Sequence, residues 1–173
     1  MAMCPAREII SLPSIGPTQF KAAMRRIANT VTVITSRSGV AMNGMTATAV
    51  CSVSAEPPCI LVVINQTNRS HALIERTGTF VVNVLSDDQE YLAQHFALKS
   101  DDPFAEVEYR YGMTGVPLLP GCVASLECVV ESQTRSGTHS IFVGRVVNTD
   151  KDDGSPLLHT DGAFVKLERH RPA

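Results

Sequence analysis

The chain has 173 residues, 44% hydrophobic content, no tryptophan and a formal net charge of −2, which predicts one domain with an aliphatic core. The charge balance and the lack of a basic stripe with interleaved aromatic residues argue against nucleic acid as a partner. The longest apolar runs, such as 59–64, are too short to span a bilayer, and residues 1–10 lack the features of a signal peptide. We therefore expect a cytoplasmic protein that contacts neither nucleic acid nor membrane.

The spacing of the cysteines and histidines limits which metal sites the sequence could form. The five cysteines are scattered without a Cys-x-x-Cys pair, and the five histidines are separated from one another, so no metal site is predicted. Without an export signal, we expect the thiols to be reduced. Residues 1–15 show no period and are expected to form a flexible arm, followed by a single domain over 16–173.

A helix is predicted to open at Gly16-Pro17, because proline is tolerated in the first turn of a helix. It is expected to end at Asn29. The following apolar residues recur at helical spacing and are expected to share one face: Phe20, Ala23, Met24, Ile27 and Ala28. The β-branched segment 31–36 then predicts the first strand.

Residues 44–58 have the most unusual composition in the chain. From Met45 to Ala55, small apolar side chains alternate with mostly hydroxyl-bearing ones, which predicts a strand. Such small side chains would let a flat polar ligand lie close to the backbone. They would equally let a neighbouring helix pack closely on the strand. The pattern alone favours the packing interpretation.

A buried strand, a polar run and a short helix are predicted next. The continuous apolar segment 59–64 is typical of a buried strand, and every residue of 65–70 is polar. Ser70 is a candidate cap for a short helix over 71–75. An arginine in such a run, Arg69, suits a phosphate, helped by backbone amides at a helix start. A solvated loop with a helix cap is the commoner case.

The remaining segments predict strands at 80–85, 121–131, 139–148 and 163–168. Ser86 and Gln89 have the spacing of a capping box for a helix that reaches about Phe96. Residues 99–103 form a charged loop, and 109–120 are at most a short irregular strand. The turn at 135–137 predicts a hairpin between the strands on either side. Many strands with few short helices indicate a mainly antiparallel barrel.

Common catalytic motifs are absent from the sequence. It contains neither phosphate-binding glycine loop, nor the His-Glu-x-x-His and Gly-x-Ser-x-Gly motifs of hydrolases. His139 follows a glycine turn and begins a strand, so its side chain would lie at a barrel mouth or in a surface turn. The pattern alone favours the surface turn.

The order of the motifs resembles the flavin reductase-like domain family over residues 20–167. The matching pieces are 20–24 with 30–33, the Gly-Met-Thr-Ala-Thr run at 44–48, 51–54 with the proline pair 57–58, Asn65 with Arg69-Ser70, 80–85, 102–104, 117–119, 126–128 and 139–144. Each piece is weak by itself, and their joint order and spacing carry the resemblance.

The resemblance implies a mainly β fold with flanking helices, an antiparallel six-stranded split β-barrel of the Greek-key, FMN-binding type, assembled as a homodimer. It implies that FMN or FAD is held by Asn43, Gly44, Met45, Thr46, Thr48, Ala49, Val63, Ile64, Asn65, Arg69, Ser70, His95 and Phe96. His139 matches the family histidine near the nicotinamide. The NAD(P)H contacts correspond to His159, Thr160, Asp161 and Gly162.

One departure from the family pattern concerns the nicotinamide nucleotide. Asp161 stands where the family often has an arginine. A carboxylate there would repel an extra 2′-phosphate, which favours NADH over NADPH.

The predicted function is therefore NAD(P)H-dependent reduction of FMN or FAD, with reduced flavin passing to a separate monooxygenase. The flavin would do the chemistry while the protein aligns the two rings. His139 is the candidate catalytic residue, orienting the nicotinamide or handling a proton. The alternatives are a flavin-binding electron carrier of the same fold and a barrel that binds a ligand without turnover.

Overall fold

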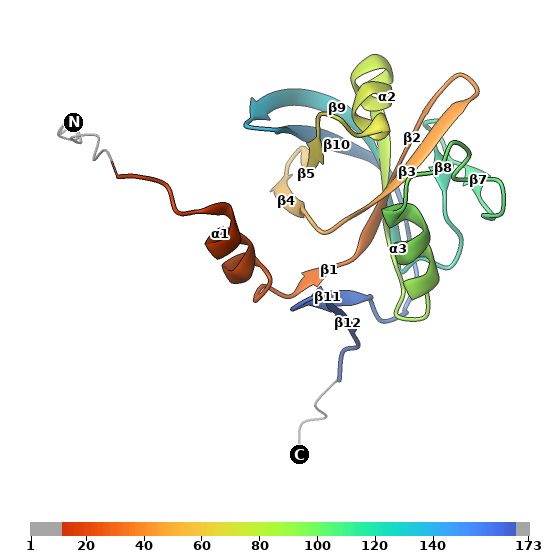
Figure 1. Ribbon diagram of the computed structural model, residues 1–173. Coiled ribbons are helices and arrows are strands. Elements are labelled where there is room, and N and C mark those ends of the chain that lie inside the picture. The colour runs from red at the N-terminus through yellow and green to blue at the C-terminus, as the bar shows by residue number, and fades with distance from the viewer. Residues whose placement is uncertain (1–11, 169–173) are drawn as a thin grey trace.

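The computed structural model describes residues 12–168 (Figure 1). The expectations for residues 1–11 and 169–173 lie outside this range, and residues 12–15 carry no regular secondary structure. The elements in chain order are α1 (Pro17–Met24), β1 (Asn29–Thr30), β2 (Thr32–Ser38), β3 (Ala41–Ala47), β4 (Val50–Ala55), β5 (Pro58–Asn65), α2 (Arg69–Thr77), β6 (Thr79–Val84), α3 (Glu90–Ala97), β7 (Arg110–Tyr111), β8 (Pro117–Leu118), β9 (Ala124–Ser136), β10 (His139–Lys151), β11 (Leu158–Thr160) and β12 (Ala163–Val165).

A seven-stranded antiparallel sheet in the order β3-β2-β6-β9-β10-β5-β4 dominates the structure. This confirms the prediction of a mainly β protein with few helices. The sheet has one strand more than the predicted six, and its edge strands β3 and β4 are not paired with each other. Strands from both halves nevertheless share one core, whose members include Ile34, Ile64, Phe80 and Phe142. The sheet therefore curls around a common interior.

The predicted hairpin is present and longer than expected. Strands β9 and β10 pair along their length through the turn at Gly137, whose φ of 57° lies in the left-handed region that glycine adopts at little cost. The two small sheets β1-β11-β12 and β7-β8 complete the strands of the described residues.

The expected continuous strand from Met45 to Ala55 is wrong. Strand β3 ends at Ala47, Thr48 and Ala49 are irregular, and β4 begins at Val50 on the opposite edge of the sheet. The Val63 amide donates to the Ala49 carbonyl at 3.1 Å, which anchors this corner to β5. The small side chains thus mark the place where the chain crosses between the two edges of the curled sheet.

Helix α1 also differs from expectation, since it ends at Met24 and projects from the body of the molecule (Figure 1). None of its residues is buried. Phe20, Met24 and Ile27, which share the predicted apolar face, are 54%, 45% and 49% exposed. The periodicity correctly indicated a helix, but the helix ends before Ile27 and Ala28, and nothing in the described chain covers the apolar side chains of Phe20 and Met24.

The other two helices flank the sheet. Helix α2 is capped by Asn68, whose side-chain oxygen accepts from the Ser70 amide at 2.9 Å, so the predicted cap at Ser70 lies two residues too late. Before α3, the Gln89 side chain accepts from the Ser86 amide at 3.0 Å, which is one of the two bonds of the predicted capping box. The Ser86 hydroxyl bonds to Asp88 instead, and Gln89 rather than Ser86 is the N-cap of the helix. Among residues 12–168, no helix has the length and apolar character needed to cross a bilayer.

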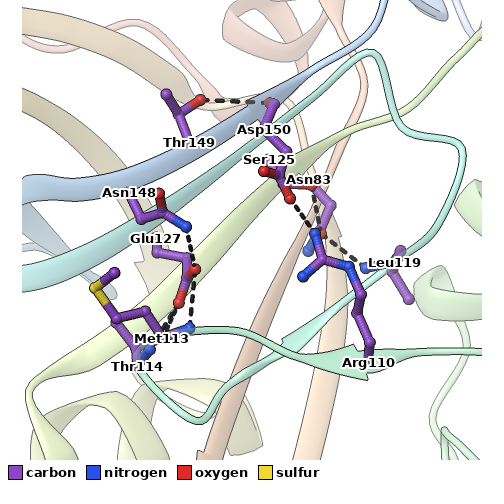
Figure 2. A network of polar contacts seen from close by, with 10 residues as sticks. All are labelled: Asn83, Arg110, Met113, Thr114, Leu119, Ser125, Glu127, Asn148, Thr149 and Asp150. Carbon is purple, nitrogen blue, oxygen red and sulfur yellow. Dashed lines mark hydrogen bonds and ion pairs between the residues drawn. The ribbon is translucent and has the colours of Figure 1, made fainter.

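A buried carboxylate holds the loop between β7 and β8 (Figure 2). Glu127 on β9 is fully buried and accepts hydrogen bonds from the Met113 amide, the Thr114 amide and hydroxyl, and the Asn148 side chain at 2.7–3.1 Å. Burial by itself would raise the pKa of Glu127, but these hydrogen bonds outweigh it, and the pKa lies below its ordinary value. We call this set of contacts the Glu127 network.

Candidate functional site

A cleft of about 480 Å³ lies between β3, the start of α2 and the segment after α3. Its lining comes from three segments: residues 43–45 form the floor, 67–69 one wall, and 96–101 the other wall. We call it the polar cleft, because Asn43, Thr67, Asn68, Arg69 and Lys99 are among the side chains that border it.

The floor of the polar cleft depends on a glycine. A Cβ added at Gly44 would lie 2.4 Å from two ring carbons of Phe96, a separation that real Cβ atoms do not show. Phe96 is itself buried, so the ring lies directly on the β3 backbone. Beside it, the Asn43 side chain donates to the Ser70 hydroxyl at 2.8 Å beneath the cleft. The floor is therefore closely packed, because the missing side chain of Gly44 leaves room for the Phe96 ring.

Cationic side chains stand on both walls. Arg69 and Lys99 are exposed, and neither forms an ion pair within the described range 12–168. The Arg69 guanidinium donates one hydrogen bond across the cleft to the Asp101 carbonyl at 2.9 Å, which leaves further N–H groups for a ligand. An anionic group, above all a phosphate, fits between two such cations.

The structure brings five of the predicted cofactor residues together in the polar cleft: Asn43, Gly44, Met45, Arg69 and Phe96. Ser70 lies under its floor as the partner of Asn43. The Thr46 hydroxyl is directed to α3, where it donates to the Ala93 carbonyl at 2.6 Å.

The remaining predicted flavin residues do not line this cleft. Ile64 is fully buried in the core, Val63 is half-buried, and the Asn65 side chain accepts from the Thr67 amide and hydroxyl. The His95 ring borders a different pocket, on the side of α3 that faces Val107.

Thr48 lines a second hollow of about 500 Å³ at the corner between β3 and β4. We call it the corner hollow. Its other lining residues include the apolar Val50, Ile60, Val84 and Leu126. Ala49 lies exposed at the same corner. The predicted flavin residues of 43–49 therefore run from the polar cleft on β3 to the corner hollow just after that strand ends.

The predicted nicotinamide residues lie on two further elements. His139 begins β10, half-buried and paired with Asn65 at the end of β5, and its Nδ1 lies 2.9 Å from the Thr138 hydroxyl. His159 and Thr160 belong to β11, and Asp161 and Gly162 form the turn to β12. None of these residues borders the polar cleft.

Lys99, with Thr67 and Asn68, is a cleft residue that the sequence reasoning did not select. Residues 99–103 were recognised as a charged loop, and Thr67 and Asn68 as part of a polar run. The signal that points to Lys99 is its position directly after the helix that carries Phe96. Without the fold, nothing in the sequence places that loop opposite Arg69.

Comparison with known proteins identifies the family. The family model described as flavin reductase like domain matches residues 24–168. A NADH-dependent flavin reductase from a Rhodococcus species is 36% identical over 159 residues, covering 90% of this chain and 89% of the relative. The reductase component of 4-hydroxyphenylacetate 3-monooxygenase from Pseudomonas aeruginosa is 33% identical, covering 89% and 94%.

A solved structure agrees with the sequence comparisons. The NADH:FAD oxidoreductase of Streptomyces globisporus C-1027 superposes with a TM-score of 0.84 at 32% identity, covering 95% of this chain and 98% of that chain. The match to the family model covers both the curled sheet and the polar cleft, since both lie within residues 24–168. The chain therefore belongs to the flavin reductase-like domain family.

Proposed function

We propose that this chain is an NADH-dependent flavin reductase that takes FMN or FAD and supplies reduced flavin to a separate monooxygenase. The observation that carries the proposal is the polar cleft, with a glycine floor at Gly44 and cations on both walls. Relatives at 33–36% identity are named for this activity or for service to a monooxygenase.

The residues of the polar cleft fit a flavin phosphate and its chain. The volume of about 480 Å³ lies within the usual range of small-molecule sites, roughly 300–1,000 Å³. Arg69 and Lys99 supply positive charge from opposite walls, and Asn68 and Thr67 supply polar atoms. Gly44 lets the Phe96 ring pack directly on the β3 backbone at the floor of the cleft. The ring end would extend along β3 toward Thr48 and Ala49 at the corner hollow.

When bound, a flavin supplies the acceptor for the hydride that NADH loses. The protein's part is alignment and charge, so no side chain need be a strict acid or base. Arg69 and Lys99 would neutralise the phosphate of a bound flavin, over a floor packed by Gly44 and Phe96. His139 orients the nicotinamide or holds a proton near it. The cleft is bordered by exposed side chains on 97–101, which suits release of the product.

NADH is the proposed donor, in line with the relatives' names. The Asp161 carboxylate is not isolated, because it accepts from the Arg26 guanidinium at 2.8 Å in an exposed ion pair. Paired in this way, Asp161 repels a 2′-phosphate less than an isolated carboxylate would. Rates with NADH and NADPH, in the native protein and in Asp161→Asn, measure its contribution.

We also propose that the chain forms a homodimer in which the curled sheet acts as a split barrel. The support is unpaired surface: the apolar face of α1 and the exposed edge strand β4, where Val53 is 51% exposed. The variant Phe20→Ser/Met24→Ser should elute as a monomer in size-exclusion chromatography. If this variant still elutes as a dimer at low concentration, the apolar side chains of α1 do not hold the dimer together.

The experiment for the function follows NADH absorbance with purified protein, with and without added FMN or FAD. We expect oxidation to be slow without flavin and to rise to saturation as flavin is added. A yellow protein without NADH turnover would favour the electron carrier. Absence of flavin binding would contradict both.

A further inference from the structure

One residue, His95, is hydrogen-bonded to both ends of the segment 98–103, which contains most of the second wall of the polar cleft. Its backbone carbonyl accepts from the Leu98 amide at 3.2 Å, where the chain leaves α3. Its Nε2 lies 2.8 Å from the Pro103 carbonyl, where the same segment ends. A carbonyl oxygen has no hydrogen to give, so Nε2 carries the hydrogen and donates it. The segment 98–103, which carries Lys99, is thereby closed into a loop.

The imidazole does this from outside the cleft. It is half-buried and borders the neighbouring pocket with Leu92, Val107 and Pro120, whereas the polar cleft is bordered by Leu98 and Lys99. Because the ring is turned away from the cleft, His95 influences a ligand there through the segment it holds.

The same ring links the wall to the floor. It packs edge-on against Phe96, with centroids 4.9 Å apart and an interplanar angle of 87°. Phe96 lies on Gly44 and also contacts Phe104, with centroids 5.4 Å apart. The middle of the wall is tied separately by Arg69 through the Asp101 carbonyl. His95 therefore couples the position of Lys99 to the packing of the floor.

We propose that His95 is a positioning residue for flavin binding, which places the Lys99 wall through the Pro103 carbonyl and does not touch the flavin. This inference rests on the proposed function of the polar cleft. It predicts that loss of the Nε2–H donor loosens the wall and weakens flavin affinity, while the rate at saturating flavin is retained.

The test uses His95→Ala, and His95→Gln as the conservative variant, whose side-chain amide can still donate to Pro103. Gln94→Ala, on the neighbouring exposed position, is the matched control; within residues 12–168 its side chain bonds only to Glu90. We expect the flavin Kd and KM of His95→Ala to rise about five- to tenfold with kcat changed less than about twofold. His95→Gln should recover most of the affinity.

A second measurement does not depend on flavin or on activity. Trypsin cleaves after Lys99, so the rate of cleavage between Lys99 and Ser100 reports how firmly the wall is held. Cleavage should be several-fold faster in His95→Ala than in the native protein, His95→Gln or Gln94→Ala. Unchanged cleavage in a folded His95→Ala protein overturns the proposal.

Flavin titrations separate this inference from the proposed function. If the native protein binds no flavin, the proposed function fails, and the proposal for His95 fails with it even where cleavage at Lys99 is accelerated. If the native protein reduces flavin but His95→Ala keeps the native KM, only the positioning role fails. A fall in kcat with unchanged KM would also overturn it, since that pattern indicates a direct part in hydride transfer.

Discussion

The polar cleft and the Glu127 network are both built from polar and charged side chains, but these side chains serve different purposes in the two regions. In the network, both oxygens of a fully buried carboxylate are occupied by hydrogen bonds from Met113, Thr114 and Asn148. In the cleft, Arg69 and Lys99 are exposed and form no ion pair within the described residues 12–168. Polar groups that are saturated internally hold the fold, whereas those left with free donors are available to a ligand.

The largest effect is expected from Glu127→Ala, which removes the buried acceptor of the partly buried hydrogen bonds from Met113, Thr114 and Asn148. The free energy of unfolding should fall by about 3 kcal/mol, measured by urea denaturation. The flavin Kd of the folded protein should stay close to native, because the network is remote from the lining of the cleft.

The matched control is Glu131→Ala on the same strand, which removes an exposed ion pair with Arg145. That change should cost less than about 1 kcal/mol. Equal losses in the two variants would show that the buried network stabilises the fold no more than a surface pair does.

The second effect tests the cleft floor through Gly44→Ala. The added methyl group meets the buried Phe96 ring, so the ring or the β3 backbone, both of which line the cleft, must shift. We expect the flavin Kd to rise at least about tenfold, measured by quenching of flavin fluorescence. Gly16→Ala is the control, since no heavy atom of the part of the chain that the structure describes lies within 4 Å of a Cβ there. Native flavin affinity in folded Gly44→Ala would contradict the proposal that the floor packed by Gly44 and Phe96 shapes the flavin site.

The third prediction concerns His139, which stands apart from both regions. His139→Ala should slow NADH-driven flavin reduction by about tenfold or more, and should weaken flavin binding less than that. Ser136→Ala, in the same hairpin, should leave both quantities near native. Equal losses of rate and flavin affinity in His139→Ala would argue against a role at the nicotinamide.

The smallest effect is the acid response of the Glu127 network. Its hydrogen bonds hold the pKa of Glu127 below the ordinary value of 4.5 despite the opposing effect of burial. A lowered folded-state pKa contributes stability that is present above the unfolded pKa and is lost as pH falls through the folded pKa. The stability difference between native protein and Glu127→Gln should therefore narrow on going from about pH 5 to about pH 3. A constant difference would contradict this linkage.

Local signals in the sequence predicted much of the fold. The turn at Gly137 and the apolar run of β5 each depend on neighbouring residues, and each is found where expected, whereas only the Gln89 half of the predicted capping box is formed. The break at Thr48 and Ala49 was missed because the alternation of small residues continues across it. Whether a strand continues or crosses to another edge is decided by pairing with distant strands, which periodicity does not contain.

Only those residues of the candidate site that belong to family motifs could be predicted from the sequence. Gly44, Arg69 and Phe96 came from the family resemblance, and the structure gathers them in one cleft. Lys99 was missed, because a lysine in a charged loop has no local pattern that tells a ligand contact from a solvated side chain. The spacing of apolar residues in α1 indicated a helix, but the sequence does not say what covers these side chains.

The most direct test of the account compares NADH oxidation at increasing FMN or FAD in the native protein and in Arg69→Gln/Lys99→Gln. We predict saturable, flavin-dependent oxidation in the native protein. In the double variant, the flavin KM should rise roughly tenfold or more while the limiting rate stays near native, because both cations of the cleft are lost. Flavin-independent oxidation in the native protein, or an unchanged flavin KM in the double variant, would contradict the assignment of the polar cleft as the flavin site.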